Sequence, residues 1–239
     1  MILPPFSPSP DETLDTFAQG KLRVIQKKKG YRFSIDAVLL SQFAKIRKAE
    51  RVIDLGTGCG ILPLLLSQTT KTSSFVGVEI QEGLAESAKK NVRLNHLEDR
   101  ISILQLDIRE LRENFATGSF DVVLSNPPYR KHRSGRINPS LEKAIARHEI
   151  KATLQDLISI ASYLLPAKGR CCFIFPAMRT VDLLVTLRSR ELEPKRLQFV
   201  HPRTGEDAKF ILTESVKASG VELKVIAPLI LEEISVLSR

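Results

Sequence analysis

Residues 121–129, Asp-Val-Val-Leu-Ser-Asn-Pro-Pro-Tyr, combine a strand with side chains that can hold a planar amine. The apolar residues near its start predict a buried strand. Pro127 favours an extended Asn126, and Pro127 and Pro128 carry no N–H, so backbone carbonyls remain as acceptors. We expect the Asn126 side-chain oxygen and the Pro127 carbonyl each to accept an N–H from an exocyclic amine such as that of adenine. This draws the nitrogen toward tetrahedral geometry, while Tyr129 stacks on the base, a contact of about 1–3 kcal/mol.

Asn126, Pro127, Pro128 and Tyr129 are therefore candidate catalytic residues. The alternative is that these four residues form only a turn that ends the strand, because proline and asparagine favour turns. A glycine-rich stretch upstream favours the catalytic interpretation.

That stretch, Asp54-x-Gly56-x-Gly58-x-Gly60, follows a predicted strand and precedes a predicted helix. Such a loop lets a ligand approach bare backbone at the carboxyl end of a sheet. The dinucleotide fingerprint requires the spacing G-x-G-x-x-G, but here Ile61 occupies the sixth position. The spacing disfavours NAD and favours S-adenosylmethionine, which has no pyrophosphate to bind.

Acidic residues end the next two predicted strands. Glu79 is placed to accept both ribose hydroxyls of a cofactor, and Asp107 to accept from an adenine amino group. Each acid alone is more commonly a solvated strand-end residue, but together with the glycine loop they indicate a cofactor site. The predicted cofactor-binding residues are Asp54, Gly56, Thr57, Gly58, Cys59, Gly60, Glu79, Ile80, Asp107, Ile108 and Asn126.

Alternating strands and helices predict an α/β fold with a mostly parallel sheet of about seven strands, helices on both faces and an antiparallel hairpin at one edge. The predicted strands are 51–55, 75–79, 101–106, 120–125, 170–176, 197–200 and 209–214. The predicted helices are one capped by Ser34, then 61–68, 81–95, 141–147, 153–165 and 180–190.

We predict a loose N-terminal arm over residues 1–20 and a single domain over 21–239, because four prolines lie in the first ten residues. Within the domain, residues 21–48 form an extension packed on the core. A hairpin with a basic edge is possible where the apolar stretch 22–25 runs into residues 26–33.

Composition indicates a nucleic-acid partner. The chain has 239 residues, 43% of them hydrophobic, and carries a formal net charge of +9. No apolar run is long enough to span a membrane and no leader is indicated, so we expect a cytoplasmic protein. Cys59, Cys171 and Cys172 are expected to be buried small hydrophobes, and no metal is predicted. The candidate substrate-binding residues are Arg32, Phe33, Tyr129, Lys131, Arg133 and Arg136. A solvated basic loop is the alternative for residues 130–136.

The sequence resembles the Rossmann-like class I methyltransferases, and more closely the bacterial adenine-N6 methyltransferases that modify valine tRNA beside the anticodon. The resemblance covers nearly the whole chain and rests on residues 31–40, 54–61, 126–129, 147–149 and 228–229. It implies S-adenosyl-L-methionine as cofactor, contacts to it from residues 54–60, Glu79 and Asp107, and an amine-holding role for residues 126–129.

The Asn-Pro-Pro-Tyr motif also occurs in release-factor glutamine methyltransferases and some DNA adenine methyltransferases, and guanine-N2 enzymes of ribosomal RNA have a phenylalanine variant. Because the resemblance is closer to the adenine-N6 methyltransferases, we expect methyl transfer to adenine N6 in RNA, most simply the anticodon-loop adenine of a valine tRNA. The alternatives are a protein glutamine N5-methyltransferase and an rRNA guanine-N2 methyltransferase. Glu206 and Asp207 place negative charge where RNA contact is expected. A non-catalytic RNA-binding module and a dehydrogenase are further alternatives, and a monomer is favoured.

Overall fold

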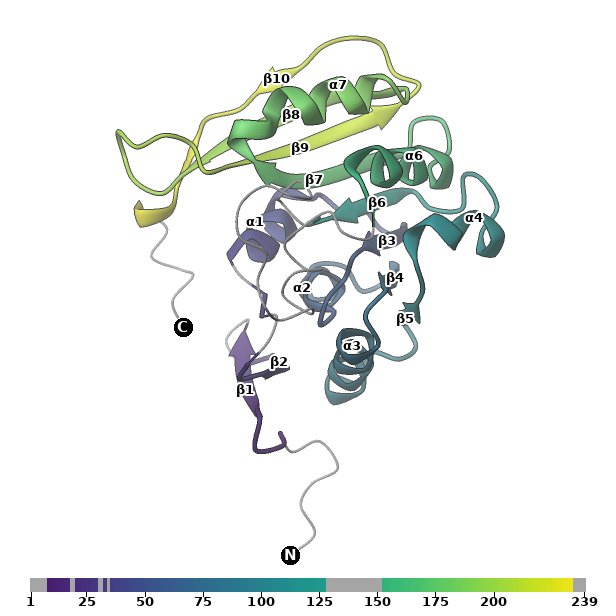
Figure 1. Cartoon of the computed structure of the whole chain (residues 1–239), viewed down its shortest axis with the longest axis vertical. Coiled ribbons are helices and arrows are strands. Elements are labelled where there is room, and N and C mark those ends of the chain that lie inside the picture. Colours follow the sequence, from purple (N-terminus) through teal and green to yellow (C-terminus); the bar gives the residue numbers. More distant parts are fainter. Residues whose placement is uncertain (1–7, 18–19, 30–31, 34, 128–151, 234–239) are drawn as a thin grey trace, which may run out of the picture.

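The computed structural model describes residues 8–17, 20–29, 32–33, 35–127 and 152–233. A sheet of nine strands forms the centre of this part of the chain (Figure 1). Five strands are mutually parallel and lie in the order β5-β4-β3-β6-β7. They are β3 (Arg51–Leu55), β4 (Ser74–Glu79), β5 (Ile101–Gln105), β6 (Val122–Ser125) and β7 (Arg170–Pro176).

The remaining strands extend the sheet beyond β7. β9 (Phe210–Lys217) pairs antiparallel with both β7 and β8 (Leu192–His201). Two short strands, β10 (Lys224–Val225) and β11 (Leu229–Ile230), run parallel to β8. The predicted mostly parallel sheet with an antiparallel edge hairpin is confirmed, and the two short strands are additional.

Helices cover both faces of the sheet (Figure 1). On one face lie α1 (Ile35–Phe43), α2 (Ile61–Ser67) and α3 (Glu82–Leu94), and on the other α4 (Leu111–Asn114), α6 (Leu154–Leu164) and α7 (Thr180–Arg188). Single turns of 3-10 helix lie at Ile108–Glu110 (η1), Ala177–Arg179 (η2) and Leu231–Glu233 (η3). The predicted helix over 141–147 lies outside the described residues. No helix in the described ranges is both long and apolar enough to cross a membrane.

Side chains along the strands alternate between two apolar cores, as the pleat of a buried strand requires. Cys172 packs in the core under α1 and α2, and its neighbour Cys171 packs in the core under α6 and α7. All three cysteines are buried, which confirms the expectation, and burial raises the pKa of the Cys59 thiol to about 12.

The N-terminal segment departs from the prediction. β1 (Glu12–Phe17) pairs antiparallel with β2 (Leu22–Lys27) in a separate two-stranded sheet, so the expectation of a loose arm is wrong for residues 12–17. The strand paired with β2 therefore lies upstream of it and not over residues 26–33. From Thr13 to Phe17 half-buried and exposed residues alternate, but Thr13 and Asp15 occupy half-buried positions and Leu14 an exposed one, so the apolar signal of β1 in the sequence is faint.

β8 begins five residues before the predicted strand, at Leu192. Its first half contains Pro194, and the register shifts between Pro194 and Arg196. A proline and a bulge interrupt the period-two pattern, which explains why the sequence predicts only the regular second half.

Candidate active site

The glycine loop and Asn126 emerge side by side at the carboxyl edge of the sheet. β3 and β6 are parallel neighbours with Asp54 opposite Leu124, two residues before Gly56 and Asn126 respectively. The Ser125 hydroxyl donates to the Leu55 carbonyl at 2.6 Å, which ties the two strand ends together. Asn126 is half-buried and Pro127 is buried. Pro128 and Tyr129 lie outside the described residues.

The three glycines of the loop have backbone conformations that glycine favours. The φ angles of Gly56, Gly58 and Gly60 are 80°, 58° and 84°, in the left-handed region where a side chain adds strain. The backbone N–H groups of Gly56 and Thr57 both donate to the Val78 carbonyl at 2.9 Å, which holds the loop against β4. Gly60 immediately precedes α2, so the loop opens a helix as predicted.

Gly77 on β4 makes room for this loop, and the sequence reasoning missed it. A Cβ at Gly77 would lie 2.9 Å from the Thr57 side chain and 2.8 Å from Ile103 Cδ1, closer than real Cβ contacts. A glycine inside a strand often marks a close approach of another segment, and this was the signal available in the sequence.

Asp54 is the buried acid of the site, with 1% of its surface exposed. Within the described residues, neither of its carboxylate oxygens has a hydrogen-bond partner, and the same is true of the buried Thr57 hydroxyl. Burial, with a smaller effect of the charge of Glu79, raises the pKa of Asp54 to about 7. The Thr57 hydroxyl opposes the rise, although its oxygen lies outside hydrogen-bond geometry. Buried polar atoms are normally satisfied, so this cluster fits a site completed by a ligand that carries donors.

Glu79 is held in place by backbone donors. Its Oε2 accepts from the Gly58 N–H at 3.0 Å and its Oε1 accepts from the Gln81 N–H at 2.9 Å. The carboxylate is buried, and it connects the end of β4 to the glycine loop. Each carboxylate oxygen can accept more than one hydrogen bond, so this arrangement leaves capacity for ligand hydroxyls.

Asp107 follows β5 and caps η1. It accepts from the Arg109 backbone N–H at 3.0 Å and pairs with the Arg109 guanidinium through both carboxylate oxygens. Ile80 and Ile108, which follow the two acids, are half-buried. Along the edge the order is therefore Asn126, the glycine loop, Glu79 and Asp107.

The two candidate substrate residues near the hairpin also have structural roles. Arg32 forms an ion pair with Asp15 at 2.9 Å and donates to the Thr13 hydroxyl at 2.8 Å. The ring of Phe33 packs edge to face on Phe17, with centroids 5.2 Å apart. Arg32 and Phe33 thus help to fix the hairpin, and a role in substrate binding remains a prediction. Lys131, Arg133 and Arg136 lie outside the described residues.

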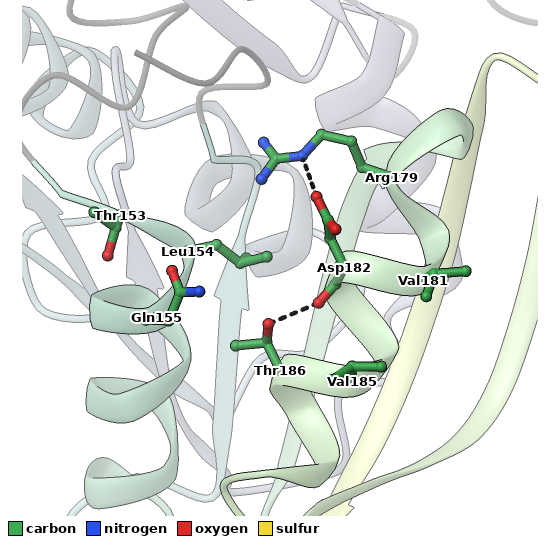
Figure 2. Close-up of a pocket in the computed structure, with 8 residues that line it drawn as sticks. All are labelled: Thr153, Leu154, Gln155, Arg179, Val181, Asp182, Val185 and Thr186. Carbon is green, nitrogen blue, oxygen red and sulfur yellow. Dashed lines mark hydrogen bonds and ion pairs between the residues drawn. The ribbon is translucent and has the colours of Figure 1, made fainter.

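A hollow of about 570 Å³ lies between the N-terminal turns of α6 and α7, and Figure 2 shows the side chains that line it. α7 follows the carboxyl end of β7, so the hollow lies at the same sheet edge as Asn126, on the face covered by α6 and α7. Its wall includes Gln155, Arg179 and the exposed Val181, and Arg179 Nε donates to Asp182 at 3.3 Å. None of the predicted site residues that the structure describes lines this hollow.

Comparison with known proteins agrees with this geometry. Residues 34–174 match the family model of the methyltransferase small domain. A tRNA1(Val) (adenine(37)-N6)-methyltransferase of a Flavobacteriaceae bacterium is 32% identical over 76% of this chain and 81% of that protein. The protein of the same name from Porphyromonas gingivalis is 32% identical over 84% of this chain and 80% of its own length.

Solved structures show the same fold. A crystal structure of a predicted O-methyltransferase from Agrobacterium tumefaciens superposes with a TM-score of 0.67 at 24% identity, over 82% of this chain and 86% of that chain. TrmN from Thermus thermophilus has a TM-score of 0.52 at 22% identity, over 76% of this chain and 48% of that chain. These likenesses confirm the Rossmann-like class I fold. The glycine loop, the strand-end acids and the relatives together lead to one conclusion: the chain belongs to the methyltransferase small-domain family and is a relative of the tRNA1(Val) (adenine(37)-N6)-methyltransferases.

Proposed function

We infer that this protein transfers a methyl group from S-adenosyl-L-methionine to the exocyclic N6 amine of an adenine in tRNA. The substrate we propose is the adenine beside the anticodon of a valine tRNA, the nucleotide that its relatives' name specifies. The observation that carries this inference is the position of Asn126, which lies directly beside the glycine loop at the carboxyl edge of the sheet.

The residues at this edge fit the proposed cofactor. The order of glycine loop, Glu79 and Asp107 along the edge matches an elongated molecule with an amino-acid end, a ribose and a base. The buried oxygens of Asp54 and Thr57 have no hydrogen-bond partner among the residues that the structure describes, which suits a ligand with donor groups at its amino-acid end. In the same part of the chain, no heavy atom beyond Gly56 and its two neighbours lies within 4 Å of a Cβ built on Gly56, so there is space above the loop.

The protein contributes acceptors and orientation to the reaction. The bound cofactor supplies an electrophilic methyl group on a sulfonium. The Asn126 side-chain oxygen and the Pro127 carbonyl each accept one N–H of the adenine amine, so its lone pair turns out of the ring plane toward that methyl group. The nitrogen becomes cationic and acidic once it forms the new bond, and then loses a proton to solvent. This chemistry requires no general base beside Asn126.

A tRNA anticodon loop suits a site of this kind. The amine must be reached outside a base stack, and an anticodon loop already exposes its bases, so the cost of unstacking is lower than in a duplex. The net charge of +9 favours a polyanionic substrate over a protein glutamine.

Methyl transfer from labelled S-adenosylmethionine tests the proposal. The protein is incubated with undermodified total tRNA, with ribosomal RNA and with release factors in parallel, and the products are digested to nucleosides or amino acids. N6-methyladenosine from tRNA is expected. A valine tRNA transcript with guanine in place of adenine 37 is the matched control and should accept no label. Label in N5-methylglutamine or N2-methylguanine would contradict the proposed substrate, and the absence of label in every acceptor would contradict methyl transfer.

A further inference from the structure

The side chain of Asn91 on α3 is completely buried and bonds to backbone groups of two distant segments. Its Nδ2 donates to the carbonyls of Ile25 and Cys59, both at 3.0 Å. Its Oδ1 accepts from the Ile25 N–H at 2.7 Å. Both hydrogens of the amide are therefore used, one on β2 and one on the glycine loop.

One turn later on α3, Asn95 makes the same pair of contacts to β2 without reaching the loop. Its Oδ1 accepts from the Arg23 N–H at 2.9 Å and its Nδ2 donates to the Arg23 carbonyl at 2.7 Å. Arg23 and Ile25 are two positions apart on β2, so their backbone N–H and C=O groups lie along the same edge of that strand. Asn91 and Asn95 therefore bond to β2 much as a neighbouring strand would. Figure 1 shows the hairpin of β1 and β2 beside this helix.

The Cys59 carbonyl lies between two glycines of the loop. Gly58 and Gly60 have no Cβ, so the backbone on either side of Cys59 is less restricted by steric contacts than that of other residues. Glu79 holds the loop through the Gly58 N–H, and the Gly60 N–H donates to the Thr57 carbonyl at 3.0 Å. Asn91 holds the carbonyl end of the peptide between Cys59 and Gly60, whose N–H end is the group bonded to Thr57.

The same face of α3 also sets the distance between the helix and the loop. A Cβ at Gly60 would lie 3.2 Å from the Cβ of Ala88, three residues before Asn91. The helix backbone thus already lies against the loop at Gly60, and a short amide at Asn91 reaches Cys59 from there. Because contacts on one rigid helix hold both the loop and β2, displacement of either one is transmitted to the other.

We propose that Asn91 is a positioning residue of the cofactor site, which orients the glycine loop and couples that orientation to the docking of the β1–β2 hairpin. This inference rests on the proposed function only in placing the cofactor along the glycine loop. Without the Asn91 amide, the peptide after Cys59 keeps only the bond from the Gly60 N–H to the Thr57 carbonyl, so the loop is held less firmly and more of it must be ordered when the cofactor binds. Affinity for the cofactor therefore falls, while the acceptors at Asn126 are unaffected.

Calorimetric titration with S-adenosylmethionine and S-adenosylhomocysteine tests this role in Asn91→Ala, with Asn95→Ala as the matched control. Both variants lose two hydrogen bonds to β2. Asn95→Ala also loses the bond from its Nδ2 to the Asn91 carbonyl, and only Asn91→Ala loses the bond to the loop. We expect the Kd of Asn91→Ala to rise about tenfold and that of Asn95→Ala to change less than about twofold. The kcat of Asn91→Ala at saturating cofactor should be close to that of the wild type.

Amide hydrogen exchange of the glycine loop, measured without cofactor, gives an independent readout. Faster exchange at Gly58 and Gly60 is expected in Asn91→Ala and not in Asn95→Ala. If Asn91→Ala does not fold, Asn91→Ser replaces it. A serine hydroxyl keeps one donor, so the Kd is then expected to rise by less than in Asn91→Ala.

Equal Kd values for the two alanine variants, or a Kd of Asn91→Ala equal to that of the wild type, would overturn the inference and leave the proposed function intact. Failure of the wild-type protein to bind either cofactor form would overturn the proposed function and, with it, the role of Asn91.

Discussion

Replacing Asp54 by asparagine should stabilise the cofactor-free protein relative to the wild type, and this gain should increase as the pH rises. The Asp54 carboxyl is buried and its oxygens have no hydrogen-bond partner in the described ranges of the chain, so its ionised form is unfavourable in the folded chain. Asparagine has nearly the same shape and no charge. The substitution therefore removes the cost of burying a carboxylate and leaves the packing at the end of β3 intact.

The size of the effect follows from the pKa of Asp54, which is about 7 in the folded chain against an ordinary value of 3.8. Below the ordinary value the carboxyl is protonated in both states, and the stability is unaffected. Between the two values the folded chain holds a proton that the unfolded chain has lost, so the free energy of unfolding falls as the pH rises. Above the folded pKa the loss is complete and amounts to about 4 kcal/mol.

Urea denaturation of wild type and Asp54→Asn across the pH range measures this cost. The asparagine amide adds a penalty of about 1–3 kcal/mol for its own missing partners, but that penalty does not depend on pH. The difference in unfolding free energy between variant and wild type should therefore shift by about 2–3 kcal/mol in favour of the variant between about pH 5 and about pH 8.

A difference that stays flat over this range would refute the reasoning, because it would mean that Asp54 ionises in the fold as easily as in the unfolded chain. The same variant should bind S-adenosylmethionine about tenfold more weakly than the wild type does, since a neutral amide accepts hydrogen bonds less strongly than a carboxylate. Stability gained together with affinity lost would identify Asp54 as a residue retained for its ligand.

Three further substitutions test other parts of the site and of the core. Asn126→Ala should abolish turnover and leave the calorimetric Kd for the cofactor within about twofold; full activity would reject this residue as the amine acceptor. Gly77→Ala should lower the unfolding free energy, measured by urea denaturation, by about 1–3 kcal/mol through overpacking. In the same assay Gly83→Ala, in the first turn of α3, should be neutral or stabilising by about 0.5–1 kcal/mol. Glu50→Ala removes the nearer of two carboxylates that pair with Arg170, at 2.7 Å against 3.5 Å for Glu214. The Arg170 side chain is only 7% exposed, and the substitution should cost about 3 kcal/mol in the same assay. A loss below about 1 kcal/mol would show that other acceptors replace Glu50.

The parallel half of the fold could be predicted from the sequence because its signals are local. β3 and β7 have the predicted boundaries, since each is a short apolar run between turn residues. The positive φ angles at Gly56, Gly58 and Gly60 likewise follow from residue type and spacing. Asp54, near the end of the first of these runs, could be predicted as a candidate site residue for the same reason.

Features that depend on contacts between distant segments could not be predicted in this way. β1 is paired with β2 and has little apolar alternation of its own, so nothing within residues 12–17 marks it as a strand. Asn91 shows the same limit, because in the sequence it is one polar residue on an amphipathic helix. Its partners Ile25 and Cys59 are 66 and 32 residues away, and only the packing of α3 against both segments reveals them.

The glycine loop combines both cases. Its glycines permit the observed backbone but do not select it, because a glycine loses more conformational freedom on folding than any other residue. Selection comes from outside the loop: the Val78 carbonyl holds its first N–H groups, Glu79 holds Gly58, and Asn91 holds the carbonyl of Cys59. A chain with the same loop sequence but without these three contacts would have to order the loop on binding, and its affinity for a cofactor would be lower by that ordering cost. The loop sequence alone is thus evidence for the class of ligand, while the affinity for that ligand depends on the residues of β4 and α3 that hold the loop.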